Sequence, residues 1–174
     1  MGEALRVILL IGLAAAALTT GALTLNWWME PERRLRRAML KSLGRAAETE
    51  AFAPAEGRAA GLDFTGGQVA VLWDRGANGL VFAFEEVEGG EMIVDGHVVA
   101  RVRRGEPRKA LDIMAPEAAE VTLRLMFLDA RWPEFELALW NARTQSQAPS
   151  HTASPAEALR LGRRWLSHIE ALMR

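Results

Sequence analysis

The sequence predicts an α+β protein with an N-terminal transmembrane helix, a small antiparallel β domain and a C-terminal α-helix. Three observations lead to this fold class. One long apolar run, residues 7–25, contains neither a charge nor a proline. Short alternating runs separated by turn sequences occupy residues 62–141, and residues 155–174 carry apolar side chains at helical spacing. The 174 residues leave room for one folded domain beyond the span.

Composition excludes several classes of function. The net charge is −1, so the chain has no overall electrostatic field that would attract nucleic acid. It contains no cysteine, which excludes a disulfide framework, thiol catalysis and a cysteine-ligated metal. Arginine makes up nearly all the basic residues and alanine is abundant, which we interpret as the coding bias of a GC-rich genome.

Residues 1–30 are predicted to form a transmembrane anchor. As a helix, residues 7–25 would extend about 28 Å, close to the thickness of a bilayer's hydrocarbon core. Trp27 and Trp28 follow directly, where amphipathic rings suit the headgroup level. A cleaved signal peptide is the alternative. It is disfavoured because the apolar run is long, only Arg6 precedes it, and no Ala-x-Ala site comes before the tryptophans.

Charges on the two sides of the span predict its orientation. Arg6 is the one basic residue before it. Six basic residues follow it: Arg33, Arg34, Arg36, Arg37, Lys41 and Arg45. Positive charge stays on the cytoplasmic side, so we expect a bacterial inner-membrane protein with its domain in the cytoplasm.

Small residues recur every four positions within the span, at Gly12, Ala16 and Thr20. Such a stripe allows a second helix to pack closely against the first. An alanine-rich composition also produces stripes of this kind by chance.

Residues 31–45 are predicted to form a basic amphipathic juxtamembrane helix. Pro31 suits the first helical turn, and apolar residues recur at helical spacing up to Gly44. This helix either adsorbs to anionic lipid or is the ordinary basic flank of a single-span protein, and the second role is the commoner one. Residues 46–61 are rich in Ala, Gly, Pro and Glu without a sustained period, which predicts a linker.

The predicted β domain, residues 62–141, begins with two hairpins. The β-type runs 68–73 and 80–87 are joined by a segment that contains the turn signal Asn78-Gly79. The runs 91–94 and 97–103 flank Asp95-Gly96, a sequence favoured in type I′ turns. In the second of these, alternation predicts that Val98, Ala100 and Val102 face inward.

Three further elements complete the predicted domain. A short strand is expected at 110–114, and the alternating runs 121–128 and 135–140 are expected to pair antiparallel. Residues 142–154 contain few apolar side chains, which predicts a flexible loop. The helix 155–174 then begins with Ser154 as N-cap, Pro155 in the first turn and Glu157 in a capping box.

Six or seven strands followed by a C-terminal helix resemble the element order of a pleckstrin-homology-like barrel. The resemblance covers residues 62–174 and rests on the order of elements alone. It implies a closed barrel capped by the helix. An open antiparallel sheet or a small sandwich with one packed helix is the alternative.

The inventory of reactive side chains predicts no catalytic, cofactor or metal site. His97, His151 and His168 lack the spacing of metal ligands, and no serine or glycine motif of a known catalytic or phosphate site is present. Isolated histidines of this kind are usually solvated surface residues.

Two surface features remain as candidates for binding. A basic patch comprises Arg101, Arg103, Arg104, Arg108 and Lys109. Four glutamates nearby in sequence would neutralise it: Glu85, Glu86, Glu88 and Glu91. Trp132, in the loop before Pro133, is expected either to be exposed as a contact for a partner or to fold back over the sheet edge.

These observations favour a non-catalytic accessory or assembly subunit of a bacterial membrane protein complex. Its expected partners are the lipid bilayer and other membrane protein subunits, and nucleic acid is not among them. One alternative is a membrane-tethered module that binds lipid or phosphate at the basic patch. Another is a membrane-tethered enzyme whose carboxylates converge only in the fold.

Overall fold

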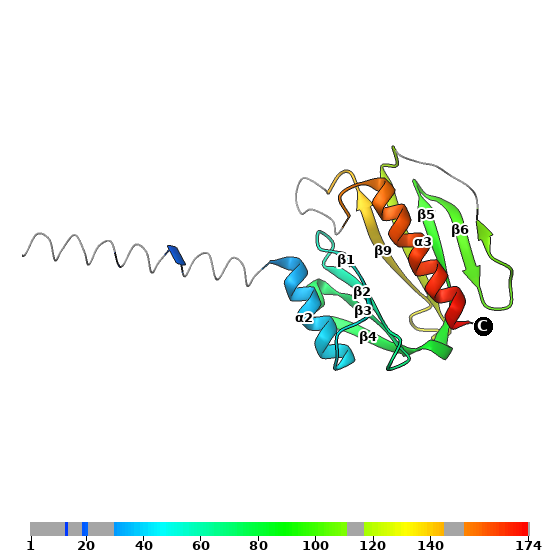
Figure 1. The fold of residues 1–174 in the computed structure, drawn as a ribbon, viewed down its shortest axis with the longest axis horizontal. Coiled ribbons are helices and arrows are strands. Elements are labelled where there is room, and N and C mark those ends of the chain that lie inside the picture. Colours follow the sequence, from blue (N-terminus) through cyan, green and yellow to red (C-terminus); the bar gives the residue numbers. More distant parts are fainter. Residues whose placement is uncertain (1–12, 14–18, 21–29, 111–116, 145–151, 174) are drawn as a thin grey trace, which may run out of the picture.

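The computed structural model describes residues 13, 19–20, 30–110, 117–144 and 152–173. Within them the chain forms two antiparallel sheets and a C-terminal helix, so the α+β class is confirmed (Figure 1). The hydrophobic run predicted to span the membrane lies almost wholly outside these residues. No helix in the described part of the chain is both long and apolar enough to cross a bilayer.

The first half of the domain contains a helix and a four-stranded sheet of order β1-β2-β3-β4, called here the N-terminal sheet. Short 3₁₀ turns, Asp74–Gly76 and Phe84–Glu86, follow its last two strands. The elements are α2 (Pro31–Leu43), β1 (Thr49–Ala53), β2 (Arg58–Asp63), β3 (Gln68–Trp73) and β4 (Asn78–Ala83).

The second half contains a five-stranded sheet of order β7-β6-β5-β8-β9, called here the C-terminal sheet. The last helix, α3, packs on one face of it. The elements are β5 (Val87–Val94), β6 (His97–Arg103), β7 (Lys109–Ala110), β8 (Glu120–Phe127), β9 (Glu134–Asn141) and α3 (Pro155–Leu172).

Helix α2 is part of the folded domain. Its predicted helical span is confirmed, from Pro31 at the first position to the left-handed cap at Gly44. Leu35 and Met39, one turn apart, are wholly buried against the N-terminal sheet. Their neighbours in the sheet are Phe52, Ala59, Ala70 and Leu72.

The prediction of a linker at residues 46–61 is wrong. This segment contains β1 and the first half of β2. Its small residues are there because α2 lies directly on the sheet: a Cβ added to Gly61 would come within 2.8 Å of the Met39 sulfur. The domain therefore begins at Pro31, and the abundance of alanine and glycine reflects close packing between two layers.

The other face of the N-terminal sheet belongs to the main core. Ala60, Leu62, Val69 and Val71 point away from α2 and pack in one cluster with residues of the C-terminal sheet and of α3. The face of the C-terminal sheet that lies under α3 contributes Met92, Leu123, Leu125, Leu137 and Leu139. The N-terminal sheet is thus covered on both faces.

The pleckstrin-homology-like closed barrel is wrong, because strand pairing breaks between β4 and β5. Among the described residues nine strands form two separate sheets, where six or seven strands were expected. The predicted continuous strand 80–87 is interrupted by the 3₁₀ turn Phe84–Glu86. There the Glu86 carboxylate accepts a hydrogen bond from the Ala83 N–H, and Val87 starts the second sheet.

Both predicted hairpins are present, but only one has its turn where the sequence placed it. Asp95 and Gly96 have φ of 48° and 81°, as a type I′ turn requires. The Asn78-Gly79 signal is not the turn. The chain reverses at Asp74–Gly76 instead, and Asn78 and Gly79 already belong to β4.

The predicted inward face of β6 is wrong at Val98. A register shift lies between Met92 and Ile93 of β5: Met92 pairs with Ala100 and Ile93 pairs with Val98, so Val99 is an extra residue in β6. Val98 therefore faces solvent and Val99 is buried, whereas Ala100 and Val102 face inward as expected.

The later elements match the sequence closely. Strands β8 and β9 pair antiparallel, and Val121, Leu123, Leu125 and Phe127 are all buried. The backbone N–H of Glu157 donates to the Ser154 hydroxyl oxygen at the start of α3, as the capping signal predicted. Of the strand expected at 110–114 only Ala110 is described, as the last residue of β7, and most of the predicted loop 142–154 lies outside the described residues.

If α2 belongs to the domain, removing its buried side chains will destabilise the whole fold. Leu35→Ala is expected to lower the free energy of unfolding of the full chain in detergent by about 2–4 kcal/mol, because it leaves a cavity under the helix. Leu40→Ala, on the exposed side of the same helix, is expected to change it by less than about 0.5 kcal/mol. Urea titration followed by tryptophan fluorescence measures both, and equal effects would contradict the docking of α2.

Candidate functional site

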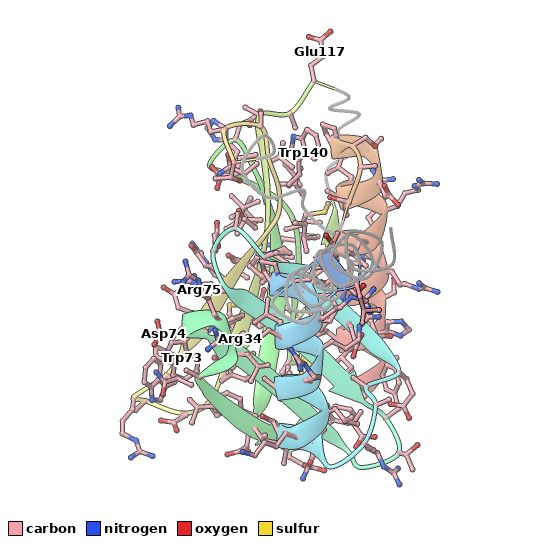
Figure 2. All side chains as sticks on the ribbon, turned by 90° about the vertical axis from the view of Figure 1, so that its left-hand side faces the viewer. Arg34, Trp73, Asp74, Arg75, Glu117 and Trp140 are labelled. Carbon is pink, nitrogen blue, oxygen red and sulfur yellow. The ribbon has the colours of Figure 1, made fainter. Side chains whose placement is uncertain are left out.

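The outward face of α2 carries the basic residues predicted to meet the membrane. Because Leu35 and Met39 face the sheet, the side chains of Arg33, Arg34, Arg36 and Arg37 are exposed. Residues 26–30 alone separate this helix from the predicted span. In Figure 2, Arg34 lies on the same side of the molecule as the β3–β4 turn, which α2 contacts.

Ion pairs organise this arginine face. Arg33 pairs with Glu30, and Arg36 lies 3.1 Å from Glu32 on its own helix. Arg36 also reaches β1, where its Nε lies 3.3 Å from the Glu50 carboxylate and its guanidinium lies over the Phe52 ring at 5.3 Å. Arg36 therefore fastens α2 to the sheet in addition to facing solvent.

An open groove runs between α2 and β1. Its volume is ≈ 760 Å³, and both cationic and anionic side chains line it, together with the exposed Leu40. The charged lining residues are Glu30, Glu32, Arg33, Arg36, Arg37 and Glu50. A groove with paired charges suits a zwitterionic or polar surface better than a polyanion.

The predicted basic patch does not form one cationic surface. Arg103 pairs with Glu88, and Arg101 lies 3.9 Å from Glu91 and 3.4 Å from Glu106. The bond to Glu88 raises the pKa of the Arg103 guanidinium. Neutralisation by glutamates, which the sequence suggested, is therefore present at these two arginines.

The other members of the patch point elsewhere. The Arg104 guanidinium donates to the backbone oxygens of Glu85 and Val87, next to the junction of the two sheets. Arg108 reaches α3, where it lies 3.3 Å from the Glu170 carboxylate. Lys109 is exposed in the short edge strand β7. These side chains join structural elements and do not converge on a common ligand position.

A charged network on the outer face of the C-terminal sheet was not predicted. Arg124 on β8 lies 3.0 Å from Glu91 on β5 and 2.6 Å from Glu136 on β9. The hydrogen bond with Glu136 is the main cause of the raised pKa of the Arg124 guanidinium. Glu91 is only 8% exposed, so this carboxylate depends on its cationic neighbours. The register of β5, β8 and β9 brings these residues together, and no sequence motif predicts the network.

Side chains from other segments close the free edge of β9. The Arg58 guanidinium donates to the Glu136 carbonyl oxygen at 3.0 Å, and the Thr152 hydroxyl donates to the Leu139 carbonyl oxygen. The Glu56 carboxylate accepts from the Ala138 N–H. Partial desolvation, with repulsion from nearby carboxylates, raises the pKa of Glu56. The β1–β2 hairpin thereby joins the two sheets, and the segment before α3 is bound to β9.

The Trp132 ring packs at a tilt of 32° against Trp73, the last residue of β3. The ring centroids are 5.0 Å apart, and Trp132 remains 45% exposed. Figure 2 places Trp73 beside Asp74 and Arg75 at the end of the N-terminal sheet. The ring thus folds back onto a neighbour and still presents one face to solvent.

Several predicted residues lie outside the description. Trp27, Trp28, Gly12 and Ala16 are among them, and Thr20 is described as helical. Within the described part, no three His, Cys, Asp or Glu side chains are grouped so that they could hold a metal ion.

Of the histidines, His168 contacts Phe64 at 5.0 Å between ring centroids. Burial, followed by the nearby Arg164, lowers its pKa. The His168 imidazole packed on the Phe64 ring is a structural contact between α3 and the β2–β3 turn.

Comparison with known proteins gave no match: no protein-family model, curated protein or solved structure is similar to the chain.

Replacing Arg124 tests whether the network stabilises the sheet. Arg124→Met is expected to lower the free energy of unfolding by about 1–3 kcal/mol, because it removes the closest cation from the buried Glu91. Arg131→Met is the matched control, since the Arg131 side chain is 86% exposed and its replacement is expected to cost less than about 0.5 kcal/mol. Chemical denaturation of the full chain measures both changes. An unchanged free energy of unfolding in Arg124→Met would show that the network adds nothing to stability.

Proposed function

We propose that the chain is a single-pass inner-membrane protein that serves as a non-catalytic accessory or assembly subunit of a bacterial membrane protein complex. Its sheet domain would lie on the cytoplasmic side. The observation that carries this proposal is the burial of Leu35 and Met39 under the N-terminal sheet, which makes α2 part of the domain.

The short connection between span and domain limits where the domain can lie. A five-residue segment, residues 26–30, reaches at most about 17 Å even when fully extended. With no linker after α2, the domain stays at the membrane surface. A surface held at this distance can contact the membrane-proximal parts of a neighbouring subunit, which suits an accessory role.

The arginine face of α2 favours the same placement. Its arginine side chains are exposed, so they are available to phospholipid headgroups without unfolding the domain, although Arg36 also contacts β1. Each basic residue near an anionic leaflet contributes about 1 kcal/mol, and pairing with Glu30, Glu32 and Glu50 reduces that contribution. The helix would therefore orient the domain more than it would anchor it.

Affinity purification tests the accessory role. The tagged full-length chain, extracted from its native membrane in mild detergent, is expected to bring down one or more membrane proteins in stoichiometric amount. A variant lacking residues 1–30 keeps all of α2. If the span is part of the interface, the amount of membrane protein that co-purifies with this variant is expected to be at least about tenfold lower. Mass spectrometry identifies and counts what co-purifies.

The truncated variant also serves as the folding control, because its thermal unfolding reports whether the domain is intact. Recovery of the full-length chain without any stoichiometric protein would contradict the accessory role. Equal recovery with both variants would restrict the interface to the domain.

Cysteine labelling tests the orientation, because the chain has no native cysteine. Arg131→Cys places a thiol at a highly exposed position of the domain, and Glu3→Cys places one before the span. A membrane-impermeant maleimide applied from the periplasmic side of the intact inner membrane is expected to label Glu3→Cys alone, because positive charge after the span holds the domain inside. Labelling of Arg131→Cys before the membrane is opened would reverse the topology.

A further inference from the structure

Strand β4 forms an edge of the N-terminal sheet and pairs with β3 on one side only. The Phe84 N–H donates to the Gly67 carbonyl oxygen at 3.0 Å. Because only alternate residues of an antiparallel strand bind the neighbouring strand, this bond determines which residues of β4 bind β3. The backbone N–H and C=O groups of Gly79 and Val81 therefore point away from β3. Among the described residues no other strand pairs with this edge, and Figure 1 shows β4 as the outermost strand of its sheet.

The edge of β4 is less protected against pairing than the edge of β9. Its sequence, Asn-Gly-Leu-Val-Phe-Ala, contains no charge and no proline. The contrast is with β9, whose edge is occupied by Arg58, Thr152 and Glu56. Within the described part of the chain, the Glu86 carboxylate accepts from the outward-facing Ala83 N–H at one end of β4, and no strand pairs with the outward groups of Gly79 and Val81.

The strand is self-complementary in antiparallel pairing. A two-fold axis at Val81 sets Val81 opposite Val81 of a second copy, and Gly79 opposite Ala83. The outward groups of Val81 and Gly79 then form about four interchain hydrogen bonds. Val81, opposite Ala70 in the register, has its side chain 40% exposed on the face that carries α2, so the two valines would cover each other.

The symmetry of this pairing fits two chains in one membrane. A two-fold axis perpendicular to the sheet keeps the same face of both copies on the same side. Both α2 helices, and both Pro31 ends, then lie on one side of a continuous sheet. Such an arrangement lets two hydrophobic segments enter one bilayer from the same side.

The sequence of the hydrophobic segment supplies independent support. In the predicted helix, Gly12, Ala16 and Thr20 would form a small-residue stripe that allows two identical helices to approach closely. We propose that the open edge of β4 is the docking surface for a second copy of this chain, forming a two-fold dimer with a continuous sheet. The symmetry argument rests on the membrane anchor of the proposed function.

Disulfide cross-linking of the full chain in its native membrane tests the interface. A single Val81→Cys substitution brings the two Cα atoms to about 5.5 Å in the paired strands, within the range for a disulfide. Val98→Cys is the matched control, because Val98 is 43% exposed in β6, away from this edge. Oxidation is expected to yield at least about five times more covalent dimer from Val81→Cys than from Val98→Cys. Equal yields would overturn the proposal.

A charge-exchange experiment tests pairing without cysteine chemistry. Energy transfer is measured in membranes between two full-length copies with different fluorescent tags. It is expected to fall severalfold when both copies carry Val81→Lys, or both carry Val81→Glu, because like charges then lie opposite each other. One copy of each is expected to restore it, and Val98→Lys in both copies is expected to leave it unchanged. Transfer that Val81→Lys does not lower would contradict the dimer.

The membrane fraction of the same samples separates two kinds of failure. If the chain is recovered in membranes and the Val81→Cys variant does not cross-link, this inference is wrong and the anchor of the proposed function is retained. If the chain is recovered in the soluble fraction, the anchor is wrong, and the cross-linking yield still reports on the β4 edge.

Discussion

The packing of α2 on the N-terminal sheet determines how the rest of the molecule is organised. A 13-residue helix is marginal in water by itself, and burial of Leu35 and Met39 contributes about 1.5–3 kcal/mol for each side chain. The sheet needs the helix equally, because Phe52 and Leu72 would otherwise be exposed. This contact extends the domain at least to Pro31, and so it brings the domain next to any membrane segment that precedes it.

Covering a sheet on both faces changes the sequence that can form it. Ala59, Ala60 and Leu62 are all buried, and Gly61 between them leaves room for Met39. Such a run shows no period of two, and its small residues look like a linker. The C-terminal sheet has one covered face, so β8 alternates cleanly and the sequence predicted it correctly. The error at residues 46–61 and the success at β8 have the same physical origin.

The charged surface was predictable in composition and unpredictable in arrangement. The sequence indicated that glutamates would neutralise the arginines of the basic patch, and Arg103 with Glu88 does so. It did not indicate the network around Arg124, because strand register decides which side chains on β5, β8 and β9 are neighbours. The extra residue in β6 likewise reversed Val98 and Val99 without any turn or glycine signal. Local pattern predicts elements, whereas contacts across strands depend on the whole sheet.

The open edge of β4 is also consistent with a chain that is held in a membrane. Each interchain hydrogen bond contributes about 0.5–1.5 kcal/mol, and free association in solution costs at least about 4 kcal/mol. One short strand pair is therefore too weak to hold two soluble domains together at low concentration. Anchoring removes much of that cost, because two chains confined to one surface meet at a high effective concentration. In the proposed membrane-anchored chain, an edge that would be harmless in a dilute soluble protein would thus become an effective contact, because α2 would hold the domain close to the membrane.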